Sequence, residues 1–220
     1  MTARSEVPEL DGRARGARRL GVLGGSFDPP HRGHLHAADA ARGAFALDHV
    51  LLVPAARPPH KPGRQLASGA DRAALLSLLA AGDDGLSVWT GELSREGPSY
   101  SVDTARALRR ARGQEAELFW ILGSDNLPGL AGWREAEELL RLAQPIVIFR
   151  AGDPLELGDE VAGLSEPARA RLAAGLVAAP PMRISSTELR RRLAAGEDPG
   201  EELPEDLREY IAARGIYRAA

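Results

Sequence analysis

Short, uninterrupted apolar runs recur along the chain, and segments with helical apolar spacing separate them. The runs occur at 19–23, 50–53, 86–89, 118–122 and 145–149, with a shorter one at 176–177. Helices are expected at 33–45, 70–81, 101–112, 133–142, 166–174, from 185 onward, and at 204–214. Strands buried on both faces lack the alternation of half-exposed strands, so this pattern predicts a mostly parallel sheet flanked by helices. We expect one doubly wound α/β domain.

Composition narrows the functional classes. The 220 residues include no cysteine, which excludes disulfides, thiolate zinc sites and a cysteine nucleophile. The net charge of −3 disfavours a broad phosphate footprint, so no nucleic-acid partner is expected. No apolar stretch approaches the ~18 residues that span a bilayer, so we expect no membrane association and a cytoplasmic location. Residues 1–18 are predicted to be a disordered leader and residues 19–220 the domain.

A glycine-rich segment, residues 24–34 with the sequence GGSFDPPHRGH, follows the first apolar run and leads into a helix. Its glycines allow close approach of a ligand to the backbone, and the helix N-terminus offers free N–H groups to an anion. His31 and His34 are spaced to converge on one point near that terminus. Two imidazoles there can donate hydrogen bonds to the charge that develops during phosphoryl or nucleotidyl transfer. Asp28 is interpreted as a turn residue.

A zinc site is the alternative for this histidine cluster, because His31, His34 and His36 are close in sequence. No carboxylate or fourth histidine lies at a suitable spacing, and helical phasing turns His36 away from His34. We therefore predict no metal ligands in the protein, and interpret His36 and His49 as structural or surface residues.

A second segment, residues 184–190 with the sequence ISSTELR, has the signature of a helix start. Ser185 and Glu188 have capping-box spacing, which predicts an N-terminus at this point. Its N–H groups, with the hydroxyls of Ser186 and Thr187, can bind phosphate oxygens. Arg190 lies about one turn further and can reach the same phosphates.

Both segments resemble signatures of one superfamily. The first is similar to the HxGH signature of nucleotidylyltransferases and, more fully, to the GGTFDPxHxGH start of bacterial nicotinate-nucleotide adenylyltransferases, with Ser26 in place of Thr. The second resembles the ISSTxxR element. Such a family member has a Rossmann-like fold, and the resemblance covers about residues 19–218.

Further stretches resemble the same family. They are Val53–Pro54 with Pro58–Lys61 (VPxxxPPHK), Pro98–Thr104 (PSYTxDT), Gly123–Asp125 (GxD), Trp133 (WxxxxxL), Arg150 and the tail from Leu203 to Tyr217 (LPxxVxxYIxxxGLY). Lys61, the only lysine of the chain, falls where the family commonly places a cation. The chain departs from the family at Ala55–Ala56, where Asn is frequent, and residues 151–180 match no pattern.

The resemblance implies that nicotinate mononucleotide and ATP are joined to give nicotinate adenine dinucleotide and pyrophosphate, a step of NAD biosynthesis. It implies catalytic roles for His31, His34 and Arg190. The residues implied to bind ATP are Gly24, Gly25, Ser26, Phe27, Gly123, Asp125, Ile184, Ser185, Ser186 and Thr187. Those implied to bind the acceptor are Lys61, Tyr100, Ser101, Trp133 and Arg150. Mg²⁺ is expected to be held mainly by the phosphates of ATP.

Three alternatives stay open at this point. One is another nucleotidylyltransferase of the superfamily, with pantetheine phosphate as acceptor or with cytidylyl transfer as the reaction. Another is a preference for nicotinamide mononucleotide over the acid. The third is a non-catalytic nucleotide-binding regulator. The sequence leaves the oligomeric state undecided, with a homo-oligomer among the outcomes.

Overall fold

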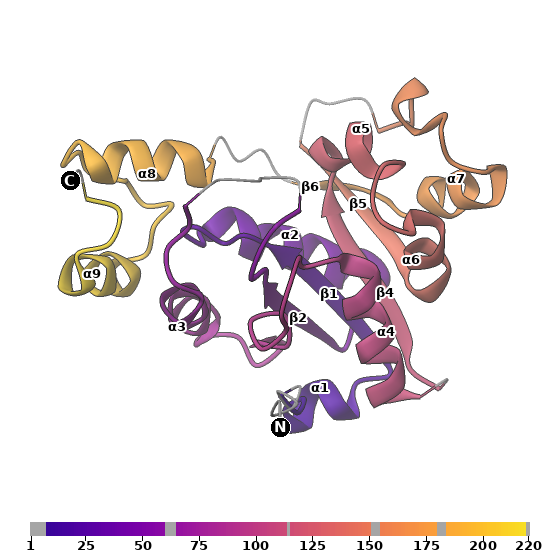
Figure 1. Cartoon of the computed structure of the whole chain (residues 1–220), viewed down its shortest axis with the longest axis horizontal. Coiled ribbons are helices and arrows are strands. Elements are labelled where there is room, and N and C mark those ends of the chain that lie inside the picture. Colours follow the sequence, from indigo (N-terminus) through magenta and orange to yellow (C-terminus); the bar gives the residue numbers. More distant parts are fainter. Residues whose placement is uncertain (1–7, 60–64, 114, 151–154, 180–183, 219–220) are drawn as a thin grey trace.

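The computed structural model describes residues 8–59, 65–113, 115–150, 155–179 and 184–218. In these ranges six parallel strands form one sheet, in the order β3-β2-β1-β4-β5-β6. The strands are β1 (Arg19–Gly25), β2 (His49–Pro54), β3 (Leu86–Val88), β4 (Glu117–Gly123), β5 (Gln144–Arg150) and β6 (Leu176–Ala179). This confirms the predicted doubly wound α/β fold, which is Rossmann-like (Figure 1).

Helices lie on both faces of this sheet. They are α1 (Gly12–Gly16), α2 (Arg32–Phe45), α3 (Gly69–Ala80), α4 (Ser101–Arg112), α5 (Leu127–Leu130), α6 (Ala136–Leu142), α7 (Glu166–Ala173), α8 (Ser186–Ala194) and α9 (Glu205–Arg214), with 3-10 turns η1 (Ser124–Asn126) and η2 (Asp159–Val161). Helix α6 covers residues 136–142 of the helix predicted at 133–142, and the short helix α5 at 127–130 was not predicted. Trp133 lies before α6, because Glu135 at its N-cap has a left-handed φ of 50° that interrupts the helix.

The central strand β4 is apolar because the side chains on both of its faces are buried. Leu118 and Trp120 pack into a core with α1, α4, α5, α6 and α7, whereas Phe119 and Ile121 pack into a second core with α2 and α3. Successive side chains point to opposite faces of a sheet, so both sets must be apolar when both faces are covered.

The sheet order places the site. β1 lies between β2 and β4, so the connections from β1 to β2 and from β3 to β4 leave in opposite directions. In such sheets a crevice opens beyond the carboxyl ends of the strands at this switch point. Gly24 and Gly25 end β1 and Gly123 ends β4 at that edge.

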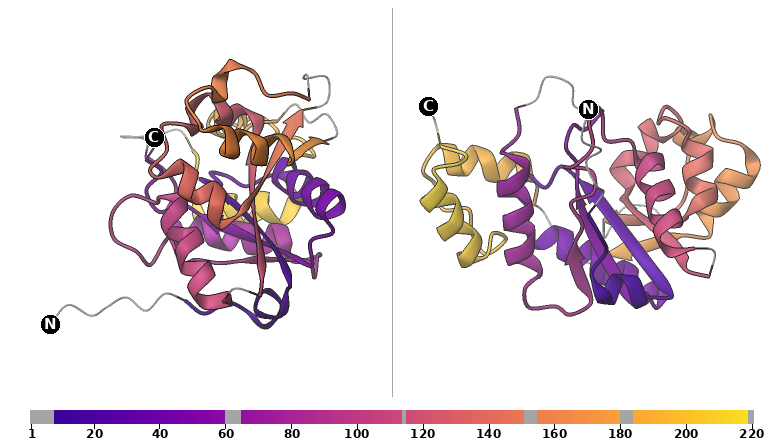
Figure 2. Two further views of the ribbon diagram at one scale, coloured as in Figure 1. Left: turned by 90° about the vertical axis from the view of Figure 1, so that its right-hand side faces the viewer. Right: turned by 60° about the horizontal axis from the view of Figure 1, so that its bottom comes forward.

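The C-terminal helices α8 and α9 form a separate layer beside α3 (Figures 1 and 2). A third apolar cluster joins them, with Leu75 and Leu79 of α3 against Leu189 of α8 and Leu207 and Ile211 of α9. This layer brings the N-terminus of α8 to the carboxyl edge of the sheet.

The N-terminal segment differs from the prediction of a disordered leader over residues 1–18. Residues 8–18 are described, and they include α1, whose N-cap Asp11 accepts a hydrogen bond from the Ala14 N–H at 2.8 Å. Leu10, Ala14 and Ala17 are buried in the first core. Only Ala14 lies within α1, and Leu10 and Ala17 flank this short helix, so no helical apolar pattern was available in the sequence. Residues 1–7 lie outside the described ranges.

None of the helices in the described ranges is long and apolar enough to cross a bilayer.

Candidate active site

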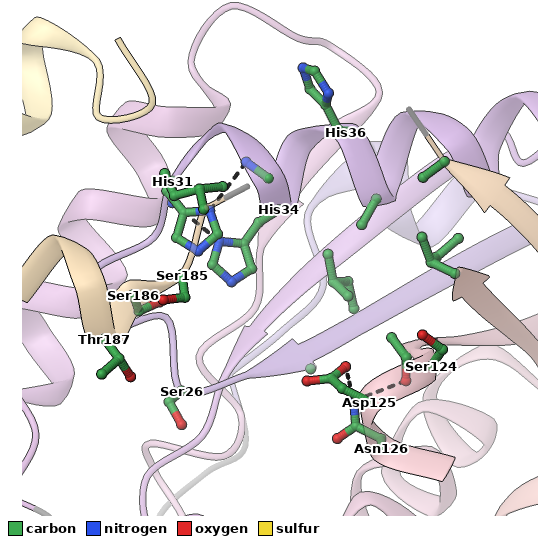
Figure 3. A pocket seen from close by; sticks show the side chains of 18 of the residues that line it. Ser26, His31, His34, His36, Ser124, Asp125, Asn126, Ser185, Ser186 and Thr187 are labelled. Carbon is green, nitrogen blue, oxygen red and sulfur yellow. Dashed lines mark hydrogen bonds between the residues drawn. The ribbon is translucent and has the colours of Figure 1, made fainter. Parts of the chain in front are cut away.

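A cleft of about 400 Å³ opens at the carboxyl edge of the sheet, and we call it the main cleft. The end of β1, the start of α2, the turn after β4 and the start of α8 form its walls (Figure 3). The residues predicted for catalysis or ATP binding that line it are Gly24, Ser26, His31, His34, Gly123, Asp125, Ile184, Ser185, Ser186 and Thr187.

His31 and His34 form the first turn of α2 as a reciprocal cap. Nδ1 of His31 accepts the Gly33 N–H at 3.2 Å, and Nδ1 of His34 accepts the His31 N–H at 3.1 Å. A ring nitrogen that accepts a hydrogen bond carries no proton, so each neutral imidazole is protonated on Nε2. The backbone thus selects the tautomer in which both rings donate through Nε2.

The two imidazole rings stack, with centroids 3.9 Å apart. His31 is 7% exposed, and burial, assisted by the neighbouring His34, lowers its pKa to about 2. A buried imidazole of this kind remains neutral at physiological pH. It is therefore a neutral hydrogen-bond donor through Nε2 and not a cation.

Gly33 lies between these histidines because no side chain fits there. A Cβ at this position would lie 2.9 Å from the His31 ring and 3.1 Å from the Ile184 side chain. The glycine lets α2 approach the segment before α8 closely. This contact explains the glycine of the HxGH signature.

The N-terminus of α8 faces the same cleft as that of α2. Ser185 caps α8 by accepting the Glu188 N–H at 3.2 Å, as its spacing predicted. Two helix N-termini on one cavity favour an anion, because each places the positive end of its dipole there. At the start of α2, however, the N–H groups of Arg32, Gly33 and His34 already donate to the Glu202 carbonyl, His31 Nδ1 and the His31 carbonyl, so this terminus does not offer the free N–H groups that the sequence predicted.

Ser186 and Arg190 of α8 also bind the glycine-rich loop. Ser186 Oγ donates to the Pro29 carbonyl at 2.9 Å, and Arg190 donates to the Asp28 carbonyl and, at 3.1 Å, to Thr187 Oγ1. Arg190 therefore lies beside the cleft and is oriented by the loop. The Ser186 hydroxyl supports that loop, a role that the sequence prediction did not include.

The opposite wall is the turn η1. Asp125 is exposed, and its Oδ1 accepts from Asn126 Nδ2 at 3.2 Å; Asn126 also donates to the Gly123 carbonyl at 3.1 Å. Figure 3 shows Ser124, Asp125 and Asn126 across the cleft from the histidines, while His36 points away from that pair along α2. Ser124 and Asn126 were missed, although both directly follow a strand end.

A second hollow of about 170 Å³, which we call the side cavity, adjoins the main cleft. The two share Leu23, Gly24, Ser26, Gly123 and Asn126, so they meet over the ends of β1 and β4. Of the residues predicted to bind the acceptor, Ser101 and Trp133 line the side cavity.

The other predicted acceptor residues lie elsewhere or are not described. Tyr100 lies in a smaller adjoining hollow, where the guanidinium of Arg134 covers its ring at 4.7 Å. Lys61 is outside the described residues. Arg150 ends β5, and its side chain is not described.

A buried carboxylate in the side cavity was not predicted. Glu92 is 5% exposed and accepts from Thr104 Oγ1 at 2.5 Å, and its other neighbours are Arg95 at 3.7 Å and the hydroxyl of Ser99. Burial raises the pKa of Glu92. Its place four residues after β3, at the carboxyl edge of the sheet, was the available signal.

Ser99 connects two walls of the side cavity. Its Oγ accepts the N–H groups of Ala56, at 2.9 Å, and Arg57, at 3.2 Å. The loop after β2 is thus fixed to the loop before α4 by backbone N–H groups, at the position where Ala55–Ala56 depart from the family pattern.

Phe27 was predicted to contact ATP, but its side chain is 2% exposed and does not line the main cleft. Its ring lies behind His34, with centroids 4.8 Å apart. The side chain therefore supports the histidine, because the left-handed φ of 48° at Phe27 turns it into the protein.

Within the described residues, no three histidine, aspartate or glutamate side chains come together as a metal site. The described side chains of the main cleft therefore form no cage for a divalent ion.

Comparison with known proteins identifies the family. Residues 22–192 match the model of the family described as "Cytidylyltransferase-like". A protein of Gloeobacter violaceus named "Probable nicotinate-nucleotide adenylyltransferase" is 43% identical over 202 residues, which cover 90% of this chain and 96% of that protein. A Pseudomonas putida protein of the same name is 37% identical over 216 residues, covering 94% of this chain and 98% of that protein.

Solved structures share the fold. The Plasmodium falciparum nicotinic acid mononucleotide adenylyltransferase complexed with NaAD aligns with a TM-score of 0.68 at 16% identity, covering 91% of this chain and 97% of that one. The family assignment rests on relatives that are 43% and 37% identical to this chain over at least 90% of its length. This chain belongs to the nicotinate-nucleotide adenylyltransferase family of nucleotidyltransferases.

Proposed function

We propose that this enzyme joins nicotinate mononucleotide to the adenylyl group of ATP in NAD biosynthesis. A 5′-phosphate oxygen of the mononucleotide attacks the α-phosphorus of ATP, and the bond from that phosphorus to the bridging oxygen of the β-phosphate breaks. Nicotinate adenine dinucleotide and pyrophosphate result. The attacking phosphate is already an anion, so no general base is required, and catalysis rests on positioning and charge stabilisation.

Two adjoining hollows suit two substrates that must meet. The main cleft, with two helix N-termini, suits the triphosphate of ATP, and the side cavity, with Trp133 and Ser101, suits the pyridine ring. They meet at Gly24 and Ser26, where the two reacting phosphates would lie. The Plasmodium falciparum nicotinic acid mononucleotide adenylyltransferase, which shares this fold, has been solved complexed with NaAD and with APC.

The observation that carries this proposal is the fixed tautomer of the two histidines. Both Nδ1 atoms accept backbone N–H groups, so His31 and His34 have their protons on Nε2. Preorganised donors of this kind stabilise charge that develops on the phosphate oxygens without reorientation during the reaction.

The proposed reaction also assigns roles to other residues of the main cleft and to residues beside it. Arg190, with the N–H groups at Ser186 and Thr187, binds the β- and γ-phosphates, and Asp125 accepts from a ribose hydroxyl. Lys61 and Arg150 stay predictions for the acceptor phosphate. Mg²⁺ enters with the triphosphate as MgATP, the form in which phosphate oxygens and water supply most of its ligands. The cytoplasmic location also stays a prediction.

The test is to incubate the purified protein with MgATP and, in separate reactions, nicotinate mononucleotide, nicotinamide mononucleotide and phosphopantetheine. We expect pyrophosphate and dinucleotide from nicotinate mononucleotide, with lower kcat/KM for the amide and no product from phosphopantetheine. Absence of product from both mononucleotides would overturn the proposal. A higher kcat/KM for the amide would retain the reaction and change the acceptor.

A further inference from the structure

We propose that Tyr217, in the segment after α9, is a positioning residue for adenylyl transfer, because its hydrogen bond to Asp28 fixes the loop that leads into His31 and His34. The inference rests on the function proposed above. It gives a role to the C-terminal tail, which the reaction leaves unexplained.

The loop from Ser26 to Pro29 needs external support. Phe27 has a φ of 48°, in the left-handed region that residues with a Cβ rarely adopt. Such a conformation persists only where the surroundings hold it. The carbonyls of three residues of this loop are held by donors from other elements.

Those donors are charged or hydroxyl groups of α3 and α8. The Ser26 carbonyl accepts from Arg72 Nη1 at 2.8 Å, and Arg72 is itself buried. The Asp28 carbonyl accepts from Arg190, and the Pro29 carbonyl accepts from Ser186 Oγ at 2.9 Å. The backbone of the loop is therefore held by donors from two other elements, α3 and α8.

The side chain of Asp28 is a further point at which other elements hold this loop. It is 1% exposed, and its Oδ1 accepts from the Tyr217 hydroxyl at 2.8 Å and from the Ala67 N–H at 3.1 Å. Its Oδ2 lies 3.7 Å from Nη1 of Arg190. Burial and the Asp28 charge raise the pKa of Tyr217, so its hydroxyl keeps the proton that it donates.

Two contacts connect the Tyr217–Asp28 hydrogen bond to the groups proposed to bind phosphate. Asp28 orients Arg190, and the Phe27 ring, one residue earlier, lies against the His34 ring with centroids 4.8 Å apart. Loss of the Tyr217 hydroxyl leaves Asp28 with one donor fewer on Oδ1. The bend at Phe27 is then held less firmly, and the Nε2–H of His34 is less often in position.

The chain contains a matched control for this contact. Tyr210 of α9 donates to Oδ1 of Asp71 at 3.0 Å, and Asp71 also accepts from Arg214 Nε at 3.0 Å. Asp71 lies in the first turn of α3 and contacts no residue of the glycine-rich loop through these bonds. Both tyrosines attach the C-terminal layer to a buried aspartate, but only Tyr217 attaches it to the loop.

The experiment compares Tyr217→Phe with Tyr210→Phe in steady-state kinetics and thermal unfolding. Each change removes one hydroxyl. We expect Tyr217→Phe to lower kcat about 10-fold, the scale of one hydrogen bond to a charged group, with both KM values within about 2-fold of wild type. Tyr210→Phe should lower Tm by a similar amount to Tyr217→Phe and leave kcat unchanged.

A double-mutant cycle with Asp28→Ala, which removes the acceptor of the Tyr217 hydroxyl, tests whether Tyr217 acts through Asp28. If it does, adding Tyr217→Phe to Asp28→Ala should lower kcat by less than about 2-fold more. Wild-type kcat in Tyr217→Phe, equal kcat losses in both tyrosine variants, or fully additive losses in the cycle would each overturn the inference. Failure of the wild-type enzyme to make dinucleotide would instead refute the proposed function.

Discussion

The main cleft and the side cavity share the ends of β1 and β4, yet they are built differently. In the main cleft, groups facing the ligand are fixed by the backbone: His31 and His34 cap α2, and Ser185 caps α8. In the side cavity, buried side chains fix one another, with Glu92 at the centre of a network that includes Thr104.

The difference predicts which kinetic constant each region controls. Donors held by backbone N–H groups are in place before substrate binds, so damage to them is expected to lower kcat. A side-chain network that shapes a pocket for one substrate affects the KM of that substrate first. Variants in the two hollows should therefore separate kcat from the mononucleotide KM.

The largest effect is expected in the main cleft, at His34. In His34→Asn the amide oxygen takes the place of Nδ1 and keeps the bond to the His31 N–H, but the Nε2–H donor is lost. We expect kcat to fall by about 10²–10⁴-fold, with an unchanged circular dichroism spectrum, and we expect the same of His34→Ala.

His34→Gln is the matched control for that change. Its amide nitrogen reaches toward the position of Nε2, while the cap to the His31 N–H is lost. We expect it to retain more activity than His34→Asn. Equal or higher activity in His34→Asn would show that His34 serves as a helix cap and not as a donor to phosphate.

A second change alters the main cleft without removing a functional group. In Gly33→Ala the new Cβ would lie 2.9 Å from the His31 ring, which must move. We expect kcat to fall by about 10–100-fold, since a small misplacement of a catalytic group has effects of this size. Gly43→Ala, on the same helix and with no atom within 4 Å of the new Cβ, is the control and should retain wild-type kcat. Wild-type kcat in Gly33→Ala would contradict the close fit.

The main cleft could be predicted from the sequence because its determinants are local. The spacing of Ser185 with Glu188 predicted the N-cap of α8, and the spacing of His31 with His34 predicted that the two imidazoles converge near the start of α2. The reciprocal cap that the two histidines form was not predicted. The strands could also be predicted from the sequence, since a sheet covered on both faces requires continuous apolar runs.

The side cavity could not be predicted in the same way. Glu92 follows β3, Ser99 precedes α4 and Trp133 precedes α6, so their proximity depends on the order of the strands and on loop conformations. Asp28 was interpreted as a turn residue because its partner Tyr217 is 189 residues away. Contacts between residues so far apart in the chain produce no local sequence pattern from which they could be predicted.

A smaller effect is expected in the side cavity, at Glu92. In Glu92→Gln, the amide cannot accept through both ends, so one of the donors Thr104, Ser99 or Arg95 loses its acceptor. We expect the KM for nicotinate mononucleotide to rise about 5–10-fold, with kcat and the KM for ATP within about 2-fold of wild type. An equal rise in the KM for ATP would show that the two hollows do not act separately.

The smallest effect concerns the pH dependence of stability. Burial raises the pKa of Glu92 above its ordinary value of 4.5, so between that value and the folded-state pKa the folded protein binds more protons than the unfolded chain. Stability from this group is full below about 4.5 and falls as the pH rises through the folded-state pKa.

Glu92→Gln has no proton to lose, so its Tm relative to wild type should increase between pH 4.5 and pH 8 by a few degrees at most. Glu96→Gln, which changes an exposed carboxylate close by, is the control. A Tm difference for Glu92→Gln that shrinks toward high pH would mean that the network stabilises the charged form. The side cavity would then resemble the main cleft, as a site whose groups are stabilised in their functional state by bonds formed before the substrate arrives.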